Sequence, residues 1–141
     1  MLGRSASGSS SGSAAAAATS LAAVTIGTDT GGSIVDPAAT TSTVGVRPTL
    51  GLVSRSGIVP NTSRQDTAGP IARNVTDAAL TLWAIQGADP ADPDTAPAEG
   101  TLPADYRTVL DREALRGKRI GVWRAGHTGD RQAHHAPGHA G

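Results

Sequence analysis

The sequence predicts an α/β fold, and three observations lead to that prediction. An alanine-rich run at residues 14–18 is typical of a helix, and residues 74–86 carry apolar side chains at the spacing of an amphipathic helix. Short runs with β-branched side chains at residues 22–28 and 119–123 are typical of strands. With 141 residues, the chain is long enough for one domain at most.

The first predicted elements surround the alanine run. Residues 13–21 are expected to form a helix, because alanine has the highest helix propensity and a serine at the start can cap it. Residues 22–28 follow as a short buried strand, and residues 30–32 form a turn. Residues 37–43 are expected to form a short helical turn, since proline is accepted in the first turn of a helix.

The middle of the chain is expected to be mostly irregular. Two short extended pieces are predicted at residues 44–47 and 51–54. Residues 57–70 are expected to form a loop, because prolines, an asparagine and a Gly-Pro pair at residues 69–70 interrupt regular structure. The arginines and aspartates of this region and its flanks are interpreted as structural: Arg47, Arg55 and Arg73 as partners of loop carbonyls and carboxylates, Asp66 and Asp77 as helix caps or loop braces.

The last predicted elements begin with the clearest helix. Residues 74–86 form this amphipathic helix, and a glycine follows at its stop position. Residues 89–100 are expected to be a linker rich in proline, aspartate and alanine. A second helix at residues 105–115 and the short strand at residues 119–123 complete the pattern.

These elements predict three regions along the chain. Residues 1–7 are expected to be a flexible lead, residues 8–123 a folded region, and residues 124–141 a disordered tail without apolar periodicity. All four histidines lie in the tail, and no pattern of carboxylates accompanies them, so no metal site is expected.

Composition excludes several classes of partner. The 12 basic residues balance the 12 acidic ones and form no basic stripe with interleaved aromatics, so no nucleic-acid partner is expected. The apolar run at residues 14–24 is too short to span a membrane, so no membrane partner is expected. The absence of cysteine rules out disulfides and fits a cytoplasmic protein.

The most informative segment is Gly27-Thr28-Asp29-Thr30-Gly31-Gly32-Ser33-Ile34. A Gly-Gly-Ser turn can leave backbone N–H groups free to bind a substrate oxygen, because glycine accepts backbone angles that other residues avoid. A serine at the end of such a turn is placed like a nucleophile beside its own oxyanion hole. A second serine cluster, at residues 8–13, lies 24 residues earlier when counted from Ser9 to Ser33.

Together, these two segments resemble the amidase signature enzymes. The resemblance continues through further motifs in the same order: Val44-Gly45-Val46-Arg47-Pro48-Thr49, Gly51-Leu52-Val53-Ser54-Arg55, Val59-Pro60, Asp66-Thr67-Ala68-Gly69-Pro70-Ile71-Ala72-Arg73, Asp77-Ala78-Ala79 and Gly87-Ala88-Asp89-Pro90. It covers residues 8–92 and 115–122. The fold that it implies is a mixed sheet flanked by helices, of which this chain would be an incomplete, truncated central part.

The resemblance implies hydrolysis of a carboxylic amide to an acid plus ammonia or an amine, through an acyl-enzyme on a Ser-Ser-Lys triad. Ser33 would be the nucleophile, and Ser9 the bridging serine after a cis Gly8–Ser9 bond. The N–H groups that would form the oxyanion hole belong to Thr30, Gly31, Gly32 and Ser33. Thr28 and Asp29 would support the serines or, equally, satisfy the backbone of the turn. No cofactor is implied; the partners would be a small-molecule amide and, through self-association, a second copy of the chain.

This sequence also departs from the family's pattern. The family lysine lies upstream of the bridging serine, whereas no lysine precedes Ser9 here, and Lys118 matches a different segment. This departure predicts that the chain alone is inactive. Ser7 and Ser11 replace glycines, and Val35 replaces an arginine. The alternatives left open are an inert truncated paralogue, a non-enzymatic binding module and an amidotransferase-type subunit.

Overall fold

The computed structural model describes residues 5–98, 100, 102 and 105–121. The chain divides into two units, Met1–Leu110 and Asp111–Gly141, and each is described by itself. The first unit holds all the helices and strands described below.

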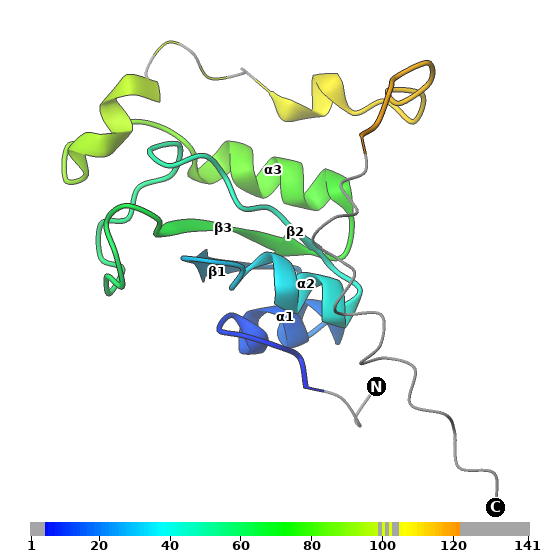
Figure 1. Cartoon of the computed structure of the whole chain (residues 1–141), viewed down its shortest axis with the longest axis horizontal. Coiled ribbons are helices and arrows are strands. Elements are labelled where there is room, and N and C mark those ends of the chain that lie inside the picture. The colour runs from blue at the N-terminus through cyan, green and yellow to red at the C-terminus, as the bar shows by residue number, and fades with distance from the viewer. Residues whose placement is uncertain (1–4, 99, 101, 103–104, 122–141) are drawn as a thin grey trace, which may run out of the picture. The chain divides into compact units, whose positions relative to one another are not determined.

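The first unit is built on a three-stranded sheet (Figure 1). Its central strand β3 (Thr67–Ala72) pairs antiparallel with β1 (Val24–Asp29) on one side and with β2 (Val44–Gly45) on the other. The α/β fold class is therefore confirmed, but the sheet of the described residues is antiparallel rather than mixed. The reason is that β1 and β2, which run in the same direction, are separated by β3 and do not pair with each other.

Helices cover both faces of this sheet. Helices α1 (Ser11–Ala18) and α2 (Val35–Thr41) lie on one face, and α3 (Val75–Ile85) lies on the other (Figure 1). Successive side chains of a strand point to opposite faces. Accordingly, Ile71 joins the core cluster of α1, whereas Ala68 joins the cluster of α3. Both faces of β3 are thus buried along its whole length.

The helix predicted at residues 13–21 is confirmed as α1, which begins two residues earlier and ends at Ala18. The hydroxyl of Ser13 donates to the carbonyl oxygen of Ile26 at 2.9 Å, and the hydroxyl of Thr25 donates to the carbonyl oxygen of Ser13 at 3.0 Å. Arg73 donates to the carbonyl oxygens of Ala17 and Ala22, at 2.9 and 2.8 Å. The bonds of Ser13 and Thr25 tie α1 to β1. The bonds of Arg73 tie the end of β3 to α1 and to the segment before β1, and they confirm the structural role expected of Arg73.

The predicted loop at residues 57–70 is partly wrong, because its last four residues begin the central strand. Pro70 lacks an N–H group, but its carbonyl oxygen accepts from the N–H of Val46 at 3.0 Å. In an antiparallel ladder the N–H and C=O of one residue point to the same neighbour. The N–H group that Pro70 lacks would therefore point toward the two-residue strand β2. The hydrogen bonds of the six-residue ladder between β3 and β1 are unaffected.

The amphipathic helix predicted at residues 74–86 is confirmed as α3, flanked by the caps Asn74 and Gln86. The Asn74 side chain accepts from the N–H of Asp77 at 2.8 Å and donates to the Asp77 carboxylate at 2.7 Å. This reciprocal pair closes the first turn and confirms the capping role of Asp77. Gly87 follows with a φ of +134°, which suits the predicted stop.

Other predictions for the C-terminal part need correction. The expected linker at residues 89–100 contains the 3-10 helix η1 (Pro93–Ala98), and it is fixed by buried Asp92 and Thr95. The helix predicted at residues 105–115 is only a 3-10 turn, η2 (Tyr106–Val109), followed by turns at residues 112–117. Asp105 caps η2 and its side chain also binds the Arg107 side chain, so these bonds favour a single short turn.

The remaining predictions concern extended pieces and the ends of the chain. Two short extended pieces were predicted at residues 44–47 and 51–54. The first corresponds to β2, Val44–Gly45, and the second contains an isolated bridge from Val53 to Gln86. The second unit has no strand in its described residues 111–121, where the strand at 119–123 was expected. Residues 122 and 123 and the tail at 124–141 lie outside the described residues.

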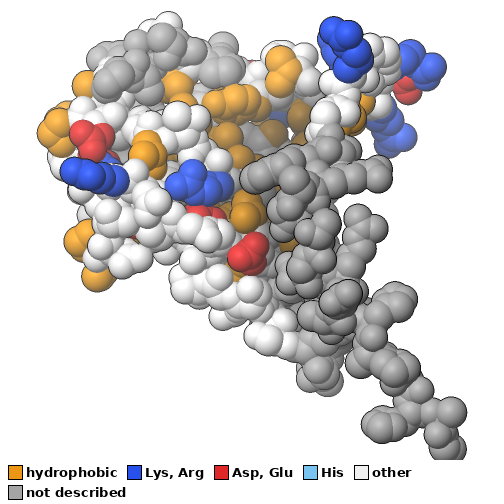
Figure 2. Space-filling view, in the orientation of Figure 1, with side chains coloured by type: hydrophobic (Ala, Val, Ile, Leu, Met, Phe, Trp, Pro, Cys, Tyr) orange, Lys and Arg blue, Asp and Glu red, His pale blue; other side chains and the backbone are white. Residues whose placement is uncertain are grey.

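The surface of the described residues carries scattered apolar side chains, and Figure 2 shows several on one face. Val24 and Ile26 of the edge strand β1 are among the exposed apolar residues, at 37% and 44% exposure. Within the described ranges, no helix is long and apolar enough to cross a membrane.

Candidate active site

The predicted nucleophile, Ser33, lies on a turn between β1 and α2 that one carboxylate fixes. Asp29, the last residue of β1, is 1% exposed. Its two oxygens accept the N–H groups of Gly32 and Ile34, each at 2.7 Å. Ser33 stands between these two bonded residues, so the backbone on both sides of the nucleophile is fixed by Asp29.

The charge of Asp29 is compensated inside the protein. Burial raises the pKa of this carboxyl, but the N–H groups of the turn and the side chain of Arg47 more than offset burial and hold its pKa below the ordinary value. The Arg47 Nε donates to Asp29 at 3.1 Å, and its Nη2 donates to the carbonyl oxygen of Gln65 at 2.8 Å. Arg47 thus has the structural role that the sequence predicted.

The segment of the second serine is joined to the same turn. The peptide bond between Gly8 and Ser9 is cis, as the resemblance implied. The N–H of the next residue, Ser10, donates to the carbonyl oxygen of Ser33 at 3.1 Å. The buried Ser10 hydroxyl donates to the Thr28 carbonyl oxygen at 3.0 Å and accepts from the Thr28 N–H at 3.1 Å. These bonds hold Ser9 against the turn of Ser33.

Ser9 and Ser33 line one cavity of about 420 Å³. The other lining residues come from the end of β1, the start of β3 and the loop between β2 and β3: Thr28, Asp29, Thr30, Arg55, Ile58, Val59, Asn61, Asp66 and Thr67. In the described part of the chain, no hydrogen bond joins the hydroxyls of Ser9 and Ser33. The two serines, 24 positions apart in the sequence, therefore share a cavity without direct contact of this kind.

The N–H groups of the turn differ in their availability. The N–H of Gly32 already has Asp29 as its partner. Among the described residues, no acceptor is found for the N–H groups of Thr30, Gly31 and Ser33. Of the four predicted oxyanion donors, three thus have no partner in the part of the chain that the structure describes, and two of these, on Thr30 and Ser33, belong to residues that line the cavity. The N–H of Gly32 serves the turn itself.

One wall of the cavity was not recognised as part of the site from the sequence. Residues 55–66, called the wall loop below, contribute Ile58, Val59 and Asn61 in addition to the two residues, Arg55 and Asp66, that were expected to be structural. Both structural expectations are confirmed. The resemblance covers this loop, but nothing in the spacing of its residues indicates that it reaches the nucleophile.

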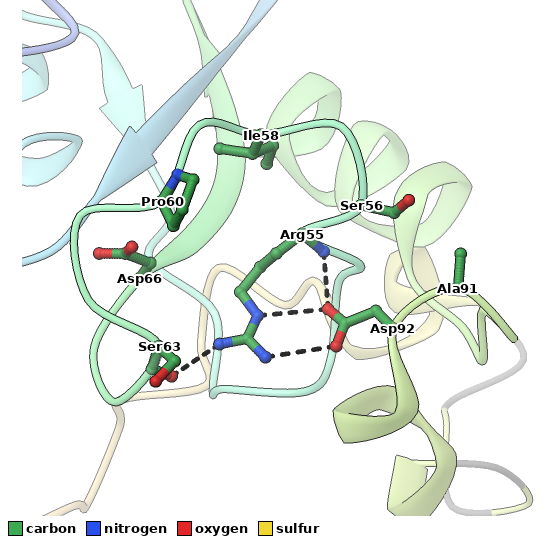
Figure 3. A pocket seen from close by; sticks show the side chains of 8 residues that line it. All are labelled: Arg55, Ser56, Ile58, Pro60, Ser63, Asp66, Ala91 and Asp92. Carbon is green, nitrogen blue, oxygen red and sulfur yellow. Dashed lines mark hydrogen bonds and ion pairs between the residues drawn. The ribbon is translucent and has the colours of Figure 1, made fainter.

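The wall loop is held at its first end by Arg55. The backbone N–H of Arg55 donates to Asp92 at 2.8 Å, and its guanidinium donates to both oxygens of the same carboxylate and to the carbonyl oxygen of Ser63 (Figure 3). The guanidinium also donates to Asp94. The hydrogen bond from the Arg55 side chain holds the pKa of Asp92 below its usual range. Arg55 therefore links the wall loop to η1.

A second cavity of about 210 Å³ lies on this loop (Figure 3). It shares Arg55, Ile58 and Asp66 with the cavity of the two serines. Because three residues line both cavities, the wall loop separates two adjoining spaces rather than forming one edge of a single space.

Metal binding has no support in the described residues, where no three His, Cys, Asp or Glu side chains are grouped. The four histidines lie outside the described residues. Lys118 is the chain's single lysine, and it belongs to the second unit.

Comparison with known proteins agrees with the motif order. The Amidase family profile matches residues 1–135. A protein named "probable amidase" from Arabidopsis thaliana is 47% identical over 86% of this chain and 24% of its own length. A glutamyl-tRNA(Gln) amidotransferase subunit from Roseobacter denitrificans is 50% identical over 82% of this chain and 22% of its own length. The structure of native peptide amidase from Stenotrophomonas maltophilia is 58% identical, with a TM-score of 0.74, over 82% of this chain and 24% of that chain. The chain thus spans less than a quarter of the length of these relatives.

Proposed function

The chain belongs to the amidase family, and from this membership we propose that it contributes to the hydrolysis of a carboxylic amide, with Ser33 as the nucleophile. The observation that supports this role most directly is the position of Ser33. It lines a cavity together with Ser9, on a turn in which the N–H groups of Thr30, Gly31 and Ser33 have no acceptor among the described residues. A nucleophile beside unpaired donors is the arrangement that acyl transfer requires.

In the proposed reaction, the Ser33 oxygen attacks the amide carbon while its proton passes to Ser9, whose own proton passes to a base. The N–H groups of Thr30, Gly31 and Ser33 would stabilise the negative oxygen of the tetrahedral intermediate. The C–N bond then breaks, the nitrogen takes a proton and leaves as ammonia or an amine, and Ser33 holds the acyl group as an ester. Water hydrolyses the ester, releases the acid and returns the proton to Ser33.

The base in this scheme is a neutral lysine in the family, and the segments of this chain that match the two serine motifs include no lysine. General-base assistance typically contributes about 10²–10⁴-fold to the rate. We therefore expect no amide turnover clearly above background from a polypeptide of these 141 residues. A reactive covalent probe is consequently a better readout of Ser33 than steady-state hydrolysis.

The substrate class rests on similarity alone. The likeness to a peptide amidase favours a peptide-like amide. The likeness to the glutamyl-tRNA(Gln) amidotransferase favours the alternative that the chain works within a complex that transfers ammonia to an aminoacyl-tRNA. Co-purification with other subunits, and product formation only in their presence, would support the second alternative over the first.

The test of the proposal is labelling with a fluorophosphonate probe, followed by mass spectrometry of the labelled peptide. We expect the label on Ser33, its loss in Ser33→Ala and a reduced labelling rate in Ser9→Ala. Ser56→Ala is the matched control, because Ser56 lines only the second cavity. Equal labelling of Ser33→Ala and the unsubstituted chain would refute the proposal and favour a non-enzymatic binding module.

A further inference from the structure

The second end of the wall loop is held by Asp66, which is 9% exposed. One oxygen of its carboxylate accepts the N–H groups of Asn61 and Thr62, both at 2.7 Å. The other oxygen accepts the hydroxyl of Thr30 at 2.6 Å, across 36 positions of sequence. Asp66 therefore joins the wall loop to the turn of Ser33.

The bond to Thr30 is the strongest link between the two segments. Hydrogen bonds to an ionised carboxylate are shorter and stronger than neutral ones, and the 2.6 Å distance is at the short end of the range for a hydroxyl donor. The Thr30 hydroxyl holds the pKa of Asp66 below its ordinary value, and the backbone donors add to this effect although burial opposes it. Asp66 is thus ionised at neutral pH, the state in which both of its oxygens accept.

Thr30 carries this link into the site. Thr30 lines the cavity, and neither its N–H nor that of the next residue, Gly31, has an acceptor among the described residues. Gly31 has open space around its α-carbon, and the N–H of Gly32 is held by Asp29. Asp29 therefore fixes the end of the turn next to Ser33, whereas a side chain from outside the turn fixes its beginning. The Asn61 amide also donates to the Thr30 hydroxyl, at the longer distance of 3.2 Å.

We propose that Asp66 is a positioning residue for amide hydrolysis, which acts through the Thr30 hydroxyl to hold the oxyanion-binding N–H groups of Thr30 and Gly31. The inference rests on the function proposed above for Ser33. Asp66 stabilises the geometry of the tetrahedral intermediate and leaves the binding of the uncharged substrate unchanged. A displacement of about 1 Å in a catalytic group costs roughly 10²-fold, so loss of this link should cost about 10- to 100-fold.

The test compares two ligands on the full chain by calorimetry: a peptide aldehyde, which adds to a serine and places an oxyanion in the hole, and the matching primary alcohol, which does not. Asp66→Asn and Thr30→Val should weaken the aldehyde about 10- to 100-fold and leave the affinity for the alcohol unchanged. Thr30→Ser, which keeps the hydroxyl, should restore the aldehyde's affinity. Asp77→Ala is the control, because it removes a helix cap away from the cavity.

A second measurement does not depend on the chemistry of Ser33. Hydrogen exchange of the peptide covering residues 28–36 should be faster in Asp66→Asn and Thr30→Val, but not in Thr30→Ser or Asp77→Ala. Unchanged exchange, or a loss of affinity that is equal for aldehyde and alcohol, would overturn the inference. If the unsubstituted chain showed no preference for the aldehyde, the proposed function would fail, and the exchange rates would still decide whether Asp66 holds the turn.

Discussion

Asp29 is the residue on which the geometry of the nucleophile depends most. Its carboxylate accepts from Gly32, Ile34 and Arg47, and it is almost completely buried. An ionised group is stable in such a place only when its hydrogen bonds replace the lost water. Asp29 therefore acts as the internal anchor of the turn, the second of the two roles that the sequence left open.

Replacement of Asp29 by alanine should destabilise the protein by about 3 kcal/mol. The N–H of buried Ile34 would lose its acceptor, and an unsatisfied buried group costs about 1–3 kcal/mol, with a further loss at Gly32. Urea unfolding measures this change. Asp36→Ala is the control, because Asp36 is exposed at the start of α2 and should cost less than about 1 kcal/mol. Equal losses in the two variants would contradict the role given to Asp29.

At the scale of elements, β3 holds the site together. It lies between β1, which ends at the nucleophile's turn, and β2, and it follows directly after Asp66. Its close approach to the segment after β2 requires glycine at position 69. A β-carbon there would lie 2.0 Å from the carbonyl oxygen of Val46 and 2.9 Å from the ring of Pro48.

Gly69→Ala should therefore destabilise the protein by about 3 kcal/mol, because backbone atoms cannot move aside as a flexible side chain does. Thermal unfolding followed by circular dichroism measures the loss. Gly12→Ala, in the first turn of α1 and with open space around it, should be neutral or stabilising by up to about 1 kcal/mol. A folded Gly69→Ala variant of unchanged stability would show that β3 and the chain after β2 lie farther apart.

At the scale of the whole molecule, hydrogen-bonded carboxylates make stability depend on pH. The pKa values of five carboxyls are lowered in the folded protein: Asp29, Asp66, Asp89, Asp92 and Asp105. A lowered pKa contributes stability that is complete above the unfolded value of about 3.9 and is lost as the pH falls through the folded value. We expect these groups to have little effect on the free energy of unfolding between about pH 7 and 5. Below about pH 4, their protonation should make the free energy of unfolding fall steeply.

Urea titrations at several pH values measure this dependence, and Asp92→Asn, which cannot titrate, should make the acid limb shallower. Stability that rises on acidification below about pH 4 would show that other groups dominate the balance.

The exposed edge strand β1 predicts self-association. In the described structure β1 has a strand partner on one side only. The side chains of Ser10 and Ser13 bond backbone groups on its other side, but the apolar side chains of Val24 and Ile26 stay exposed. Ile26→Lys should shift the chain toward monomer in sedimentation velocity, since a charge on an edge strand disfavours pairing. Val75→Lys adds the same charge on α3, where Val75 is 56% exposed. If both variants had the same effect, net charge rather than the β1 edge would control association.

The sequence by itself determined the helices α1 and α3 and the candidate nucleophile. Each of these is set by residues that are neighbours in the chain: the alanine run, the Asn74–Asp77 cap and the Gly-Gly-Ser turn. Local propensity and capping are short-range effects, so the order of residues along the chain is enough to predict them. The roles of Ser9 and Ser33 came from motif order and stay predictions.

Only the tertiary structure decided the central strand, the ordered segment around η1 and the wall loop. Thr67–Ala72 contains a Gly-Pro pair that locally disfavours a strand, and it becomes one because β1 and β2 supply partners on both sides. The wall loop reaches the site because Asp66 binds Thr30 and Arg55 binds Asp92, over 36 and 37 positions of sequence. Such contacts exist only after the chain has folded, since side chains so far apart meet only when the intervening strands pair.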